Sequence, residues 1–208
     1  MAGVSRPSPC RVHAFIDGQN LFHSVKRAFG YTYPNFDPLK LAVRVAGLAQ
    51  DRKVNQVHFY TGIPPYQRDP KWNEFWSSKI RAMKASGVRV EARTLKYGQG
   101  PAILPDGRVV PNATVPREKG IDLRLGLDVL RLARHDEFDA ALIFSQDGAL
   151  AEVVREIDSL RKEMKRWIVV DCAYPIGGYR IPGTQPLEFD KNLYDSCLDH
   201  TDYFPPKS

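Results

Sequence analysis

The stretch VHAFIDGQNLF at residues 12–22 contains a strand, a turn and the start of a helix. Its first five residues form a short, mostly apolar run, which is typical of a buried strand. Asp17 and Gly18 then form a turn signal, and apolar side chains recur at helical spacing over residues 20–28. A strand that leads into a helix is the first half of a βαβ unit, so the stretch favours a parallel sheet.

The rest of the chain continues this alternation of strands and helices. We expect strands at residues 55–61, 88–92, 139–144 and 167–170, and helices at residues 38–49, 70–86, 120–134, 149–164 and 190–197. Two of these helices begin with an Asp-Pro pair, in which aspartate caps the helix and proline takes its first position. Alternating strands and helices are joined by right-handed crossovers, which predicts a three-layer α/β/α sandwich with a mostly parallel central sheet.

Residues 93–116 interrupt the alternation because they are rich in glycine and proline. The piece ILPDGRVV within them places Asp-Gly between two apolar runs, which is a hairpin signal. We therefore expect a hairpin-like insertion over one end of the sheet. The expected organisation is a flexible N-terminus at residues 1–10, one domain at residues 11–172, and a Gly/Pro-rich extension at residues 173–208 that packs on the domain.

The composition is that of a chain that folds around a core. A length of 208 residues suits one domain with an insertion, and 43% hydrophobic residues argue against wholesale disorder. The formal charge of +6 favours association with polyanions, although many basic proteins share it. The three cysteines form no CxxC pair, which favours a reducing compartment, the cytoplasm, over a zinc or disulfide scaffold. No apolar run is long enough to span a bilayer, so we expect no membrane partner.

Three aspartates are expected to meet at one edge of the sheet. Asp17 and Asp147 each follow a predicted strand directly, and ligand sites of parallel α/β sheets lie beyond the carboxyl ends of the strands. Asp122 lies in the first turn of a helix that runs back antiparallel to the strands, so that turn reaches the same edge. Each aspartate alone could be a turn, capping or helix-dipole residue. Their coincidence at one edge indicates a shared pocket.

Clustered carboxylates repel one another unless a cation or protons neutralise them. Mg²⁺ and Mn²⁺ accept oxygen ligands, keep several waters and bridge to phosphate. The pocket therefore predicts attack on a phosphodiester by metal-activated water, with Asp17, Asp122 and Asp147 as metal ligands. Asn20 could cap the first helix or orient a metal-bound water, and Ser145 could hydrogen-bond Asp147 or a phosphate.

The sequence resembles the NYN-domain proteins, a branch of the PIN-like ribonuclease superfamily, in three pieces. These are FIDGQNLF at residues 15–22, REKGIDLRLGLDVL at residues 117–130 and ALIFSQDGAL at residues 141–150. The resemblance implies a PIN-like (NYN) fold, an Mg²⁺ or Mn²⁺ site and RNA cleavage by a metal-activated water. Matched position by position, it gives metal-ligand roles to Asp17, Asp122 and Asp147 and a polar helper role to Asn20.

One departure from the family pattern concerns the third piece. The motif commonly reads Ser-Gly-Asp-x-Asp-Phe, and here residues 145–150 read SQDGAL, so that Ala149 replaces the second aspartate. Glu152 could compensate from one turn further on, or it could simply occupy an exposed helix position. The missing carboxylate supports a second hypothesis, a non-catalytic RNA-binding module with a degenerate acidic site. A third is a phosphatase or nucleotide-hydrolysing enzyme, although no GxxxxGK[ST] loop is present.

RNA binding requires cations for the phosphates and aromatic side chains for unpaired bases. The candidates nearest the expected pocket are Lys119, Ser145, Arg124 and Lys96. Lys119 is the strongest of them because it adjoins Asp122 near a helix N-terminus. A wider set consists of Arg93, Tyr97, Arg108, Arg117, Tyr174, Tyr179 and Arg180. The expected partner is RNA, single-stranded or structured. DNA is an alternative, because the metal chemistry does not read the sugar, and the sequence leaves open a homodimer or a regulatory protein partner.

Overall fold

Six parallel strands form the central sheet in the computed structural model of the chain, which describes residues 5–103, 107–117 and 120–204. Their order across the sheet is β3-β2-β1-β6-β7-β8, and every neighbouring pair is parallel. The strands are β1 (Cys10–Asp17), β2 (Arg52–Ile63), β3 (Arg89–Thr94), β6 (Ala140–Phe144), β7 (Val169–Pro175) and β8 (Gln185–Phe189). The parallel sheet predicted from the sequence is thereby confirmed.

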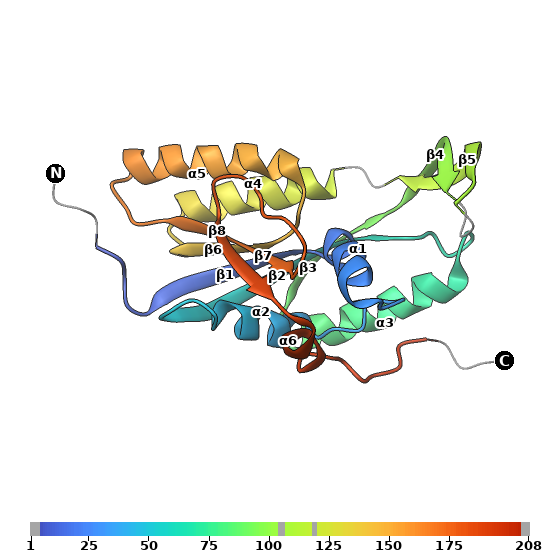
Figure 1. Cartoon of the computed structure of the whole chain (residues 1–208), viewed down its shortest axis with the longest axis horizontal. Coiled ribbons are helices and arrows are strands. Elements are labelled where there is room, and N and C mark those ends of the chain that lie inside the picture. The colour runs from blue at the N-terminus through green and yellow to red at the C-terminus, as the bar shows by residue number, and fades with distance from the viewer. Residues whose placement is uncertain (1–4, 104–106, 118–119, 205–208) are drawn as a thin grey trace.

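Helices cover both faces of this sheet (Figure 1). One face carries α1 (Gly18–Phe29), α2 (Pro38–Ala46), α3 (Pro70–Ala85) and α6 (Lys191–Asp195). The other carries α4 (Ile121–Arg134) and α5 (Ala151–Glu163), the latter entered through a 3-10 turn at Gly148–Leu150. In β6, Leu142 and Phe144 pack toward the first layer while Ile143 packs toward the second, because successive strand side chains point to opposite faces. The chain is a three-layer α/β/α sandwich.

The predicted hairpin insertion is also present. β4 (Lys96–Ile103) and β5 (Val109–Arg117) pair in an antiparallel two-stranded sheet of their own. This hairpin stands away from the three layers at one end of the molecule (Figure 1). α4 starts at the carboxyl-end edge of the sheet, because a Cβ atom on Gly120, its N-cap, would lie 3.0 Å from the side chain of Arg93 near the end of β3.

Strand β8 was not predicted from the sequence. Its segment, QPLEF, contains a proline and directs only Leu187 and Phe189 into the core, so it lacks a continuous apolar run. β8 is the edge strand and pairs only with β7. A proline is tolerated at an edge because no strand lies beyond it to receive its missing N–H. The Gly/Pro-rich region therefore contributes a sixth strand as well as a loop.

A buried ion pair crosses the sheet between β2 and β7. Arg52 Nη2 lies 2.9 Å from an Asp171 carboxylate oxygen, and both side chains are almost fully buried. The Arg52 guanidinium also lies over the Trp167 ring, 5.3 Å from its centroid. Burial raises the pKa of Asp171 to about 6, although the Arg52 charge acts in the opposite direction.

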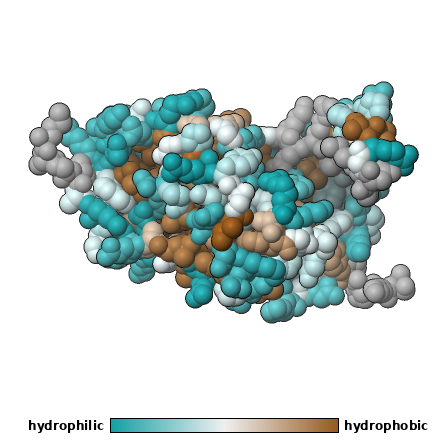
Figure 2. All heavy atoms as spheres, viewed as in Figure 1, coloured by the Kyte–Doolittle hydropathy of each residue, from teal (hydrophilic) through white to brown (hydrophobic). Residues whose placement is uncertain are grey.

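The surface also carries an apolar patch. Figure 2 shows apolar residues gathered over α2, whereas hydrophilic residues cover most of α5. Leu39 and Val43 of α2, with Leu48 just after it, are exposed.

None of the helices in the described parts of the chain has both the length and the apolar composition needed to cross a bilayer.

Candidate functional site

Asp17 is the last residue of β1 and the N-cap of α1. Its carboxylate accepts a hydrogen bond from the backbone N–H of Asn20 at 3.0 Å and another from Ser145 Oγ at 3.4 Å. Only 8% of the residue is exposed. Burial, together with the smaller effect of the negative charge of Asp147, raises the pKa of Asp17 to about 6. Asp17 is thus a desolvated carboxyl group within electrostatic range of a second one.

Gly18 allows α1 to begin directly against β2. A Cβ atom at this position would lie 2.5 Å from Phe59 Cζ and 3.0 Å from the Tyr60 carbonyl oxygen. Such distances are shorter than van der Waals contact, so any side chain would displace the helix from the strand. The glycine after Asp17 is therefore needed for packing, and it fixes where the Asp17 carboxylate leaves the sheet.

The end of β6 lies level with the end of β1. Ile16 is paired with Phe144, so the next residues, Asp17 and Ser145, leave the sheet side by side. Ser145 is buried, and its hydroxyl donates to Asp17 and accepts from the backbone N–H of Asp147 at 3.2 Å. Ser145 therefore bridges the two strand ends that carry the aspartates.

Asp147 is half-buried and starts the 3-10 turn that precedes α5. Its Oδ1 accepts from the backbone N–H of Ala149 at 2.9 Å. This contact is the capping role that the sequence left open for Asp147. One carboxylate oxygen therefore serves the turn, while the charge still acts on Asp17.

Asn20 does not cap α1, since Asp17 does so. Its side-chain carbonyl oxygen instead accepts from the backbone N–H of Gln146 at 2.8 Å and joins α1 to the loop after β6. Within the described residues its Nδ2 group forms no hydrogen bond. It is therefore a donor at the edge of the sheet where Asp17, Ser145 and Asp147 lie, which we call the acidic edge.

Asp122 is exposed in the first turn of α4. Gly126 lies one turn further along α4, on the same side of the helix as Asp122. A Cβ atom on Gly126 would lie 2.8 Å from Val153 of α5 and 3.9 Å from Leu150 of the 3-10 turn that precedes α5. That side of α4 therefore faces the turn that Asp147 begins. Among the described residues no hydrogen bond or ion pair engages the Asp122 carboxylate, and none joins it to Asp17. The structure thus links Asp17 and Asp147 through Ser145 and leaves Asp122 exposed on the neighbouring helix.

The basic candidates differ in their surroundings. Arg124 donates from Nε to Asp128 at 2.9 Å, so its charge is already paired. Asp128 is buried and also accepts from Arg131 and from the Tyr60 hydroxyl at 3.1 Å, which is a structural role. Lys96 begins β4 and is exposed. Lys119 lies outside the residues that the structure describes.

Sequence reasoning did not single out Gln146. This buried residue accepts from Arg27 Nη2 at 3.1 Å through Oε1 and donates from Nε2 to the Tyr179 carbonyl oxygen at 3.0 Å. One signal could have found it: Gln146 stands where the NYN motif commonly has glycine. Gln146 joins the acidic edge to α1 and to the loop between β7 and β8.

One protein family and several solved structures are similar to this chain. The family model of the NYN domain matches residues 11–170. A solved protein of unknown function, VPA0982 from Vibrio parahaemolyticus RIMD 2210633, is similar over 94% of this chain and 95% of its own, with 15% identity and a TM-score of 0.47. MurG from Acinetobacter baumannii is similar over 88% of this chain and 45% of its own, with 13% identity and a TM-score of 0.33. No curated protein gives a significant sequence match.

Proposed function

Because the chain belongs to the NYN-domain family and has its PIN-like nuclease fold, we propose that it is a divalent-metal-dependent ribonuclease. The reaction would be hydrolysis of RNA phosphodiester bonds by a metal-activated water. The observation that carries the proposal is the pairing of Asp17 and Asp147 through Ser145 at neighbouring strand ends. This is where parallel α/β sheets form their ligand sites.

The donors at this edge suit a hard cation. Mg²⁺ is often held by one or two carboxylates and keeps several waters, so the Asp17–Asp147 pair supplies enough protein ligands. Asp122 would add a third carboxylate from α4. No group of three or more acidic, histidine or cysteine side chains is gathered closely enough to hold a metal within the described residues. The fit therefore rests on the carboxylate pair and its oxygen chemistry.

Each residue of the edge has a role in the proposed reaction. Asp17 and Asp147, with Asp122, would hold Mg²⁺ or Mn²⁺, which supplies a nucleophilic water and polarises the phosphoryl oxygen when bound. Ser145 keeps the two paired carboxylates in register through its hydroxyl. Asn20 is held by Gln146 and offers its Nδ2 group to a phosphate oxygen. Lys119 is proposed as a phosphate contact because it lies close to Asp122 in the sequence, just before a helix N-terminus.

The proposal is tested by incubating the protein with single-stranded RNA, structured RNA and DNA of matched sequence. Reactions contain Mn²⁺, Mg²⁺ or excess EDTA. We expect RNA products with either metal and none in EDTA. Full activity in EDTA, or no product from any RNA, would refute the proposal. Products from DNA at the same rate would show that the enzyme does not read the sugar.

A specific observation favours one alternative, a non-catalytic RNA-binding module. Ala149 stands where the family commonly has a carboxylate, and no group of three possible ligands is gathered in the described part of the chain. This alternative predicts RNA affinity that does not depend on metal, with no product in any of the reactions above.

Replacing Ala149 with aspartate is expected to strengthen the metal site. Ala149 is exposed and its backbone N–H contacts Asp147, so a carboxylate there would join the edge. We expect Mn²⁺ to bind roughly tenfold more tightly, since cation affinity rises with ligand charge. Isothermal titration with Mn²⁺ and the metal dependence of RNA cleavage would both report the change.

The matched control is Ala149→Asn, which has nearly the same shape without the charge. It is expected to bind Mn²⁺ like the parent. Equal Mn²⁺ affinity of Ala149→Asp and Ala149→Asn would show that the position does not reach the metal.

A further inference from the structure

The loop between β7 and β8 is firmly anchored beside the acidic edge. Ile181 is buried in the core beneath α4 and α5, and its backbone N–H donates to the buried sulfur of Cys172. Thr184 donates from its hydroxyl to the Ile181 carbonyl oxygen at 2.6 Å, and Arg180 donates to the Thr184 carbonyl oxygen at 3.0 Å. These contacts hold the C-terminal half of the loop.

Gln146 holds the other half. Its Nε2 group donates to the Tyr179 carbonyl oxygen at 3.0 Å. A Cβ atom on Gly178 would lie 2.2 Å from that same Nε2 group, so the backbone of the loop passes directly over Gln146. The backbone of Tyr179 is therefore fixed by a buried side chain that immediately precedes Asp147 in the chain.

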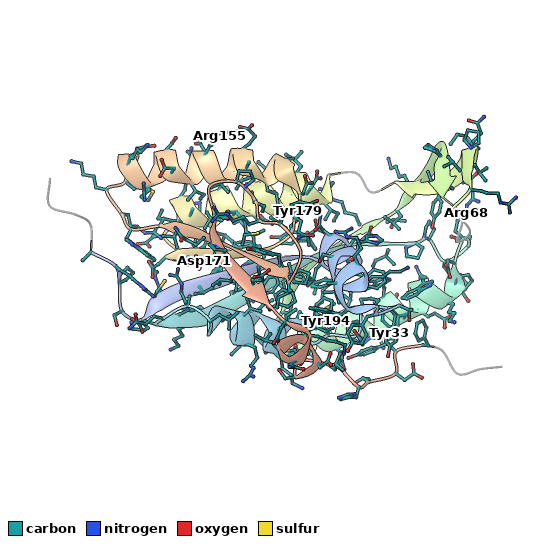
Figure 3. All side chains as sticks on the ribbon, in the orientation of Figure 1. Tyr33, Arg68, Arg155, Asp171, Tyr179 and Tyr194 are labelled. Atoms are coloured by element: carbon teal, nitrogen blue, oxygen red, sulfur yellow. The ribbon has the colours of Figure 1, made fainter. Side chains whose placement is uncertain are left out.

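The Tyr179 side chain is left outside this anchored backbone. It is 63% exposed and belongs to the loop shown in Figure 3. An exposed tyrosine alone is ordinary, but here a buried amide holds the backbone beneath it. The other end of that amide, Oε1, accepts from Arg27, an exposed cation on α1. Gln146 thus holds the backbone of an exposed aromatic residue and orients a positive charge next to the acidic edge.

We propose that Tyr179 and Arg27 form a nucleotide-binding subsite, in which the Tyr179 ring stacks on an unpaired base and Arg27 contacts a neighbouring phosphate. Gln146 is the positioning residue for both. The inference rests on the proposed function, because it treats the adjoining edge as the place where RNA is cut. Bases in a duplex are already stacked and paired, so the subsite selects single-stranded RNA.

Part of this subsite is already ordered before RNA binds. An aromatic side chain has only two rotatable angles, and the backbone of Tyr179 is already held, so little conformational entropy is lost when a base stacks on it. The Arg27 guanidinium is likewise oriented by its hydrogen bond to Gln146. An aromatic side chain on a held backbone and an oriented cation beside two carboxylates would place a single strand across the edge.

The test measures binding in EDTA, where the proposed cleavage does not proceed. Labelled single-stranded RNA and a duplex of the same sequence are titrated into the parent, Tyr179→Ala, Tyr179→Trp and the control Tyr33→Ala. Tyr33 is also exposed, and Figure 3 shows it well separated from Tyr179. We expect Tyr179→Ala to weaken single-strand binding roughly tenfold, since stacking contributes about 1–3 kcal/mol per base. Duplex binding, Tyr33→Ala and Tyr179→Trp are expected to match the parent.

A base analogue gives a direct readout of stacking. The parent is expected to quench the fluorescence of 2-aminopurine in the single strand, and Tyr179→Ala to abolish that quenching. Arg27→Gln is expected to reduce the slope of binding affinity against salt concentration by the amount of about one phosphate contact. The control Arg134→Gln, at the far end of α4, is expected to leave that slope unchanged.

The positioning role of Gln146 is tested by a double-mutant cycle. Gln146→Ala is expected to weaken single-strand binding in the parent and to have a clearly smaller effect once Tyr179 is alanine, because only the orientation of Arg27 is then lost. A general structural defect would weaken both backgrounds and duplex binding alike, and would overturn the inference.

The inference and the proposed function can fail separately. Equal single-strand affinities of the parent and Tyr179→Ala would overturn the subsite, while cleavage by the parent in Mn²⁺ would still support the nuclease. A parent that binds no RNA would overturn both.

Discussion

Asp17→Asn is expected to lower metal-dependent RNA cleavage by more than about 100-fold while leaving the protein folded. The variant loses the charge with which Asp17 would hold the metal. Substitution of groups that only support a metal ligand already costs about 10–100-fold, so loss of a ligand should cost more. Cleavage rates at saturating Mn²⁺, with thermal melting and circular dichroism, measure both parts of the prediction.

The fold should survive because asparagine keeps the local hydrogen bond. The carboxylate of Asp17 caps α1 by accepting from the Asn20 N–H, and asparagine is an equally good N-cap. The control is Asp158→Asn, a half-buried aspartate of α5 that pairs with Arg161 and Lys162. If Asp17→Asn cleaved RNA as fast as Asp158→Asn, the acidic edge would not be the active site.

Arg52→Met is expected to give the largest loss of stability, about 3–5 kcal/mol in the free energy of unfolding at pH 8. Arg52 and Asp171 are both buried, and removing one partner leaves the other charge without compensation. Methionine fills similar volume, so the loss would come from the charge more than from a cavity. Chemical denaturation of the parent and the variant measures the difference.

The loss should depend on pH in a definite direction. Burial already raises the pKa of Asp171 from 3.8 to about 6 in the folded protein. A carboxyl group with a raised folded-state pKa makes stability fall as pH rises from the unfolded value through the folded one. Removing the Arg52 charge raises that pKa further and extends the fall to higher pH. We therefore expect a smaller loss at pH 5, where Asp171 is mostly protonated in both proteins.

The double variant Arg52→Met, Asp171→Leu separates the charge from the packing. Replacing both partners by apolar residues removes the buried charge altogether, so most of the lost stability should return, and the part of the pH dependence between pH 5 and 8 that comes from Asp171 should disappear. A double variant no more stable than Arg52→Met would mean that packing, and not the unpaired carboxylate, causes the loss.

The elements predicted well from sequence are those whose causes are local. The Asp-Pro pairs mark two helix starts: Asp37 accepts from the N–H groups of Leu39 and Lys40, and Asp69 accepts from that of Trp72. Capping depends on residues within one turn, so a short window of sequence contains it. The apolar run at the start of the chain likewise becomes β1, because burial on both faces requires such a run.

Strand β8 shows where local reasoning fails. Its residues alone do not favour a strand, since Pro186 lies among them and only two side chains enter the core. β8 forms because β7 offers a row of unpaired backbone groups at the sheet edge. That template lies in another part of the chain, so only the tertiary structure reveals it.

The sequence by itself determined the NYN family, the parallel sheet and the oxygen donors Asp17, Asp122 and Asp147 at strand and helix ends. The tertiary structure alone decided which of these charges have partners: Ser145 joins Asp17 to Asp147, while Asp122 is exposed. It also decided that Gln146 would hold a loop 33 residues further on. The reason is physical: hydrogen bonds and desolvation depend on distances and directions between elements, which no local stretch of sequence contains.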